Sequence, residues 1–120
     1  MTKKGFTLVE IMIVVGVIAI LSAIAVPNYV KARRSAQSAT CIANLRQIEH
    51  AVAIWALDKN QPGSATPVWA DLMPDYIRGD PANPIKCPAG GLYTIGSAAQ
   101  WPTCSLGNAE TKEHILPDHT

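Results

Sequence analysis

The hydrophobic positions of this chain follow two different patterns before residue 60. From residue 6 to residue 26 nearly every position is apolar, and a helix needs about 20 such residues to cross a bilayer. Beyond residue 28 the apolar positions recur at helical spacings and define one stripe. That stripe consists of Cys41, Leu45, Ile48, Val52 and Trp55. We therefore predict one long helix from Phe6 to about Lys59, apolar on all sides at first and amphipathic afterwards.

A single proline, Pro27, lies inside this predicted helix. Because proline removes a backbone donor and crowds the preceding turn, we expect a kink at Pro27. At about 1.5 Å per residue the helix would be about 80 Å long, which is more than a small domain can cover. One end is therefore expected to protrude.

After Lys59 the composition changes to loops and short elements. Residues 60–64 contain turn-forming residues, and Thr66 followed by Pro67 predicts a helix N-cap and first turn, with a short helix that reaches Met73 and ends before Pro74. Three later segments have strand-like sequences, at 92–95, at about 101–105 and at 114–116. The fold class is therefore α+β, with a small antiparallel sheet packed on the amphipathic half of the helix.

Composition limits the possible functions. The chain has 120 residues and a formal charge of +1, so one small domain follows the apolar run. Its one basic cluster, around Arg33 and Arg34, directly follows that run and is typical of a membrane-flanking group. Aromatic residues make up 6% of the chain, and we expect no direct nucleic-acid binding. Motifs for catalysis or phosphate binding are missing from the sequence, so we expect a protein that is not an enzyme and has no cofactor.

Glu10 is the exception within the apolar run. An ionisable residue inside a membrane segment is costly and usually functional. Small residues at Gly16, Ala19 and Ala23 share one helix face and would let helix backbones approach closely. An ordinary secretory signal cut near Ala25 is an alternative, but it leaves Glu10 without a role.

The three cysteines lie at positions 41, 87 and 104. A small domain outside the cytoplasm gains stability from a disulfide. Pairing of Cys87 with Cys104 would close a loop worth about 3 kcal/mol, and we favour this pair. Cys41 lies on the buried stripe, where it can stay a thiol or pair with either of the others.

A zinc site is a further reading of the C-terminal half. Its candidate ligands are Cys87, Cys104, His114 and His119. Their spacing lacks the close cysteine pair of structural zinc sites. The sequence therefore predicts no metal site.

The N-terminal residues resemble a known processing signal. The run Lys3-Lys4-Gly5-Phe6-Thr7-Leu8-Val9-Glu10 is similar to the signal of type IV prepilins and type II secretion pseudopilins. Later, the run CPAGGLYTIG (residues 87–96) resembles small pilin-like proteins. The resemblance implies a ladle-shaped fold, in which a kinked N-terminal helix carries a small globular head.

The same resemblance implies a life cycle. A prepilin peptidase would cut between Gly5 and Phe6, and the new amine of Phe6 would be methylated. Residues 1–5 would then be a leader, 6–27 a transmembrane and filament-core helix half, and 28–120 the head. Glu10 would pair with the Phe6 amine of a neighbouring subunit and set the axial register.

The implied partners are further copies of the chain, the prepilin peptidase, and an inner-membrane assembly platform with its ATPase. The chain would sit in the bacterial inner membrane as a single-pass protein with its head outside the cytoplasm, and then enter a periplasmic or extracellular filament.

Two alternative functions stay open. One is a type II secretion pseudopilin that acts as a periplasmic piston rather than a surface pilus. The other, of a different class, is a small binding domain that is membrane-anchored or secreted.

Overall fold

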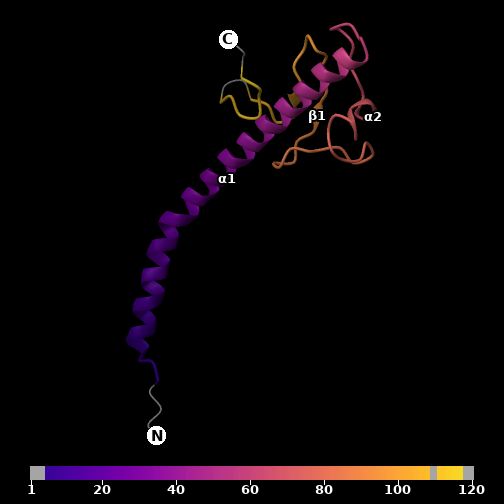
Figure 1. Cartoon of the computed structure of the whole chain (residues 1–120). Helices are drawn as coiled ribbons and strands as arrows, with labels where there is room; N and C mark the ends of the chain where they lie inside the picture. The colour runs from indigo at the N-terminus through magenta and orange to yellow at the C-terminus, as the bar shows by residue number, and fades with distance from the viewer. Residues whose placement is uncertain (1–4, 109–110, 118–120) are drawn as a thin grey trace. The chain divides into compact units, whose positions relative to one another are not determined.

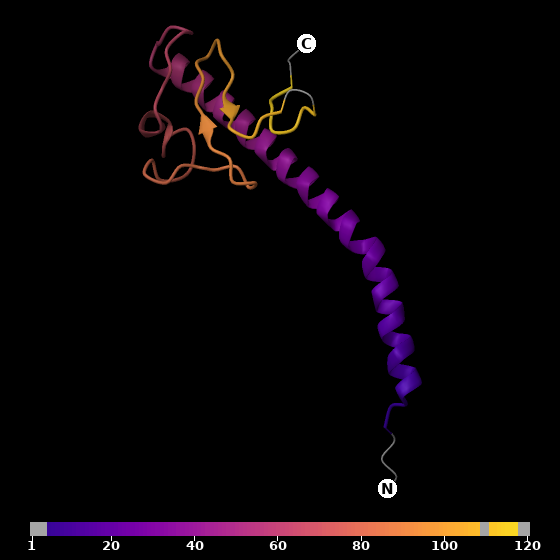
Figure 2. The same cartoon turned by 180° about the vertical axis from the view of Figure 1, so that it is seen from behind.

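A computed structural model describes residues 5–108 and 111–117 of the chain (Figures 1 and 2). Four elements follow one another: helix α1 (Leu8–Asp58), helix α2 (Trp69–Leu72), strand β1 (Tyr93–Thr94) and strand β2 (Thr103–Cys104). The chain divides into two compact units, residues 1–34 and 35–120. Each unit is described separately below.

In the first unit, α1 begins at Leu8 and continues as helix through Pro27. The long helix predicted from Phe6 to about Lys59 is confirmed to within two residues at its start and one at its end. Its first part is long and apolar enough to cross a membrane, and none of that stretch is buried in the structure. The helix continues on both sides of Pro27, and the kink expected at this residue stays a prediction.

In the second unit, the rest of α1 contributes the predicted stripe to a hydrophobic core. Cys41, Leu45 and Ile48 are fully buried, and the other two stripe residues are at most 9% exposed. Their core partners from outside α1 include Leu72 and Ile77. Burying a leucine or isoleucine of this kind contributes about 1.5–3 kcal/mol, so the stripe is the main attachment of the later segments to the helix.

Helix α2 is shorter than predicted and starts later. Its N-cap is Val68 rather than Thr66, so the N-terminal part of the prediction was wrong. A local hydrogen bond accompanies this start, in which the Val68 N–H donates to the Asp71 carboxylate at 3.0 Å. Asp71 thereby satisfies the N–H of the N-cap residue itself, which is the bond that the N3 side chain supplies in a capping box. The helix ends at Leu72, before Pro74, as expected.

The sheet has two antiparallel strands, with Tyr93 opposite Cys104 and Thr94 opposite Thr103. Both views place it beside the second half of α1 (Figures 1 and 2). The third predicted strand, at 114–116, was wrong. His114 has a backbone φ of 54°, and this left-handed conformation cannot continue a strand. An isolated bridge between Asn108 and Glu113 is the pairing that this region makes instead.

Candidate functional site: the N-terminal segment and a buried cysteine cluster

The predicted processing point lies in non-helical chain. Gly5, Phe6 and Thr7 precede the first turn of α1, and the side chain of Phe6 is 85% exposed. A peptidase requires an accessible bond that is not held in a helix. The Gly5–Phe6 bond has both properties in the structure, and its cleavage stays a prediction.

Glu10 has a local partner that the sequence interpretation missed. The Thr7 N–H donates to the Glu10 carboxylate at 3.3 Å, and the Glu10 N–H donates to the Thr7 hydroxyl at 3.2 Å. This is a capping box, and the spacing of threonine and glutamate could have predicted it. Such a cap contributes about 1 kcal/mol to a helix. Because a carboxylate has about four acceptor positions, the box leaves room for an ammonium partner.

The apolar residues after Glu10 have no cover in the structure. Large side chains throughout the run are exposed, among them Ile11 at 51%, Leu21 at 61% and Ile24 at 63%. An exposed surface of this extent marks a membrane or protein contact. Gly16 has open space around it, because a Cβ at that residue would meet nothing within 4 Å. Its predicted packing with neighbouring helices, together with Ala19 and Ala23, is therefore sterically open and stays a prediction.

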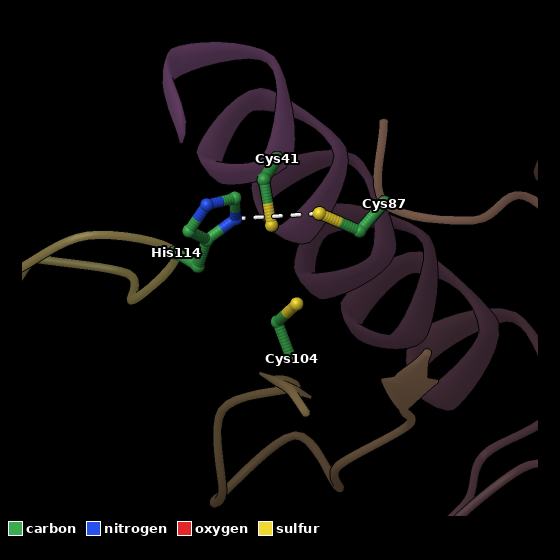
Figure 3. A group of neighbouring side chains, drawn as sticks. All are labelled: Cys41, Cys87, Cys104 and His114. Atoms are coloured by element: carbon green, nitrogen blue, oxygen red, sulfur yellow. Dashed lines mark hydrogen bonds between the residues drawn. The ribbon is translucent and has the colours of Figure 1, made fainter. Parts of the chain in front are cut away.

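The second unit contains four metal-binding side chains in one buried place. We call them the cysteine–histidine cluster, and its members are Cys41, Cys87, Cys104 and His114. Their sulfur and nitrogen atoms all lie within 4.8 Å of one another, and each residue is at most 9% exposed. Figure 3 shows the three sulfurs and the imidazole converging from separate segments. Within the cluster, Cys87 Sγ lies 3.3 Å from His114 Nδ1.

Four different segments bring these side chains together. Cys41 lies on the buried stripe of α1, Cys87 precedes β1, and Cys104 ends β2. His114 follows the bridge region, where its N–H donates to the hydroxyl of buried Ser38 at 3.2 Å. The strand register also places Tyr93 directly opposite Cys104. Because the contact joins residues far apart in sequence, spacing alone could not reveal it.

The protonation of the cluster differs from one thiol to the next. Burial raises the pKa of the Cys41 thiol to about 12, in spite of a hydrogen bond from the Tyr93 hydroxyl. Burial also acts to raise the pKa of Cys87. There, backbone hydrogen bonds at Ala89 and Gly91 and contacts with the other thiols outweigh it, so that its pKa is lowered. Cys87 is therefore the thiol that ionises most readily of these two.

The structure holds all three cysteines as thiols, so the expected Cys87–Cys104 disulfide stays a prediction. The zinc set considered from the sequence contained His119, which lies outside the described residues. In the structure the fourth member of the cluster, beside Cys87, Cys104 and His114, is Cys41. The sequence analysis considered Cys41 as a core thiol or a disulfide partner but not as a metal ligand, because its spacing from Cys87 matches no zinc motif.

Comparisons with known proteins agree with the N-terminal signal. The prokaryotic N-terminal methylation motif matches residues 1–26. The competence protein ComGC of Bacillus subtilis is 34% identical over 96 residues, which cover 79% of this chain and 91% of that protein. The chain belongs to the type IV pilin and pseudopilin family. By class it is a structural filament subunit.

Two further relatives come from different systems. The type IV wide pilus major component PilA4 of Thermus thermophilus is 36% identical over 80 residues, 67% of this chain and 59% of that protein. The type II secretion system core protein G of Pectobacterium carotovorum is 27% identical over 102 residues, 84% of this chain and 64% of that protein. The chain therefore spans less than two thirds of the length of these two relatives. No solved structure matches the chain.

Proposed function

We propose that this protein is made as a membrane-anchored precursor and assembles into a type IV-like filament. Cleavage between Gly5 and Phe6 and methylation of the Phe6 amine would precede assembly. The observation that carries this proposal is the exposed apolar half of α1, which follows directly on the methylation motif. Lipid would cover this surface first, and the helices of neighbouring subunits would cover it afterwards.

Pairing of Glu10 with the Phe6 amine of the next subunit would set the register. A carboxylate that loses its water needs a charged or hydrogen-bonded partner. The ammonium that cleavage creates at Phe6 is such a partner, and it is present only after processing. The capping box orients the same carboxylate at the start of α1, which supports its availability there.

The capping box and the intersubunit pair can be separated by substitution. Glu10→Gln keeps a side chain that can complete a capping box but removes the charge. Thr7→Val removes the hydroxyl of the box and keeps Glu10. We expect Glu10→Gln and Glu10→Leu to reduce the filament yield strongly while insertion and cleavage continue, and Thr7→Val to assemble nearly as well as wild type.

Filament yield is measured by shearing and sedimentation, and cleavage by the mass of the mature N-terminus. Normal filaments from Glu10→Leu would refute the pairing. Normal assembly of Glu10→Gln, together with losses in Glu10→Leu and Thr7→Val, would assign Glu10 to helix capping alone. Exposed Asp75 offers a control for the general effect of removing a carboxylate, because Asp75→Asn should assemble normally.

The mature N-terminus also tests the proposed processing. A chain that starts at methylated Phe6 agrees with the filament pathway. An intact Met1 would favour a membrane-anchored monomer, and a start beyond Ala25 would favour a secreted domain. The expected partners in assembly are an inner-membrane platform and its ATPase.

A type II secretion pseudopilus is the second candidate machine, and the similarity to a core protein G favours including it. In that role the filament would work as a periplasmic piston instead of a surface pilus. Deletion of the gene in its host separates the two. Loss of secreted proteins with normal surface fibres would indicate the pseudopilus, and loss of the fibres themselves would indicate a pilus.

A further inference from the structure

The cysteine–histidine cluster has the donor set of a structural zinc site. Such sites are tetrahedral, use thiolate and imidazole ligands, and commonly contain three cysteines and one histidine. With bonds of about 2.0–2.3 Å, the ligand atoms lie about 3.6–3.8 Å apart. The four donor atoms here already lie within 4.8 Å of one another, so small side-chain adjustments would close the tetrahedron. We propose that the cluster binds one zinc ion, which fastens four separate segments of the head to one another.

The chain around Cys87 forms a tight turn. Gly90 has a φ of 96°, and its N–H donates to the Cys87 carbonyl at 2.9 Å. The Cys87 N–H in turn donates to the Gly91 carbonyl at 3.1 Å. These two hydrogen bonds fix the backbone that presents the Cys87 sulfur to the cluster.

The position of His114 also indicates a purpose beyond packing. Its φ of 54° is uncommon for a residue other than glycine, and it is held by the hydrogen bond to Ser38. Nonglycine residues in such conformations cluster at functional sites. The strained backbone here presents Nδ1 to Cys87 at 3.3 Å, which is the place of a fourth ligand.

A polar contact lies beside the cluster. The Tyr93 hydroxyl accepts from the Asn44 amide at 3.0 Å, and Tyr93 lies directly opposite Cys104 in the sheet. Because Asn44 follows Cys41 on α1, this contact ties the strand pair that carries Cys104 to the helix that carries Cys41. Partners that hold metal ligands in place raise metal affinity.

The charges and protons of the site can be balanced. Zinc binding replaces the protons of three thiols, and a neutral imidazole supplies the fourth bond. Three protons are released, and a dication with three thiolates carries one negative charge. Affinity should therefore fall steeply as the pH is lowered. Cys104 and His114 also line a cavity of about 230 Å³.

The test uses the full chain in detergent, purified from its host envelope without oxygen. Elemental analysis and native mass spectrometry measure bound zinc, and cobalt added to chelated protein reports the geometry through its visible spectrum. We expect one zinc per chain, and one equivalent of cobalt giving the intense bands of a tetrahedral thiolate site. Added zinc should displace the cobalt.

Three variants test the ligands. His114→Gln should lower zinc affinity at least about tenfold, whereas His50→Gln, at an exposed histidine on α1, should leave it unchanged. His114→Cys should restore tight binding with a changed cobalt spectrum, which separates the loss of a ligand from the loss of the fold.

Several outcomes would overturn the proposal. One is a chain without metal whose mass is lower by two hydrogen atoms, with a single reactive thiol, because that result assigns a disulfide. Another is equal metal binding by His114→Gln and His50→Gln, which would place the ion elsewhere. All these readouts come from the purified subunit, so they are independent of whether filaments form.

Discussion

Gly91 lies where the Cys87 turn meets β2, and the space beside it is already filled. A Cβ added at Gly91 would lie 2.9 Å from Cys104 Sγ, and 3.0 and 3.2 Å from two side-chain carbons of Leu106. Nonbonded carbon atoms prefer separations of about 3.5–4.0 Å. The substitution Gly91→Ala must therefore push the Cys104 sulfur or the Leu106 side chain away by about 0.5–1 Å.

The expected loss of stability follows from that overlap. Inserting a methyl group into a filled core costs about 1–3 kcal/mol. For a unit of this size, each 1 kcal/mol lowers Tm by about 4–8 °C. We therefore expect Gly91→Ala to unfold about 4–24 °C below wild type. The displaced sulfur is a proposed zinc ligand, so the variant should also bind zinc more weakly.

Tryptophan emission gives a suitable assay, because Trp55, Trp69 and Trp101 all lie in the second unit. Thermal unfolding of the full chain in detergent, followed by this signal, reports the second unit without a contribution from the first. Gly63→Ala is the matched control, since a Cβ at Gly63 would meet nothing within 4 Å. It should be neutral or stabilise by about 0.4–1 kcal/mol. Equal Tm values for Gly91→Ala and wild type, or equal losses in both variants, would refute the packing deduced here.

Two further predictions concern α1 and its surroundings. Leu45→Ala, at a fully buried position, should destabilise the second unit by about 2–5 kcal/mol. Leu57→Ala, at a side chain that is 80% exposed, is the control and should change stability by less than about 0.5 kcal/mol. Denaturant unfolding measures the free energy of unfolding of both variants. The pKa of Tyr76 is raised from 10 to about 12, first of all by its hydrogen bond to the Asp58 carboxylate. Because the neutral phenol is favoured in the folded state, this contact supports the fold fully below pH 10 and is lost as the pH rises toward 12. The tyrosinate absorbance of Tyr76 should therefore titrate near pH 12, and Asp58→Ala should move it toward 10; an unchanged midpoint would contradict the contact.

Local pattern determined much of this protein. The apolar run, the stripe from Cys41 to Trp55 and the bounds of α1 all follow from helical periodicity, which a sequence displays directly. The N-terminal signal is likewise a continuous run of residues, and it identified the family before any fold was known. The capping box of Thr7 and Glu10 is equally local, and the T-x-x-E spacing is sufficient to predict it.

Tertiary structure decided the rest, because long-range contacts leave no period in the sequence. The strand predicted at 114–116 does not form, because His114 has a left-handed backbone conformation. Its N–H donates to the distant Ser38 hydroxyl instead of to a neighbouring strand. Cys41 and His114 are 73 positions apart, yet folding brings them into one cluster. The sequence by itself therefore determined the class of protein and its long helix, and only packing revealed that a residue of that helix shares a site with the end of the chain.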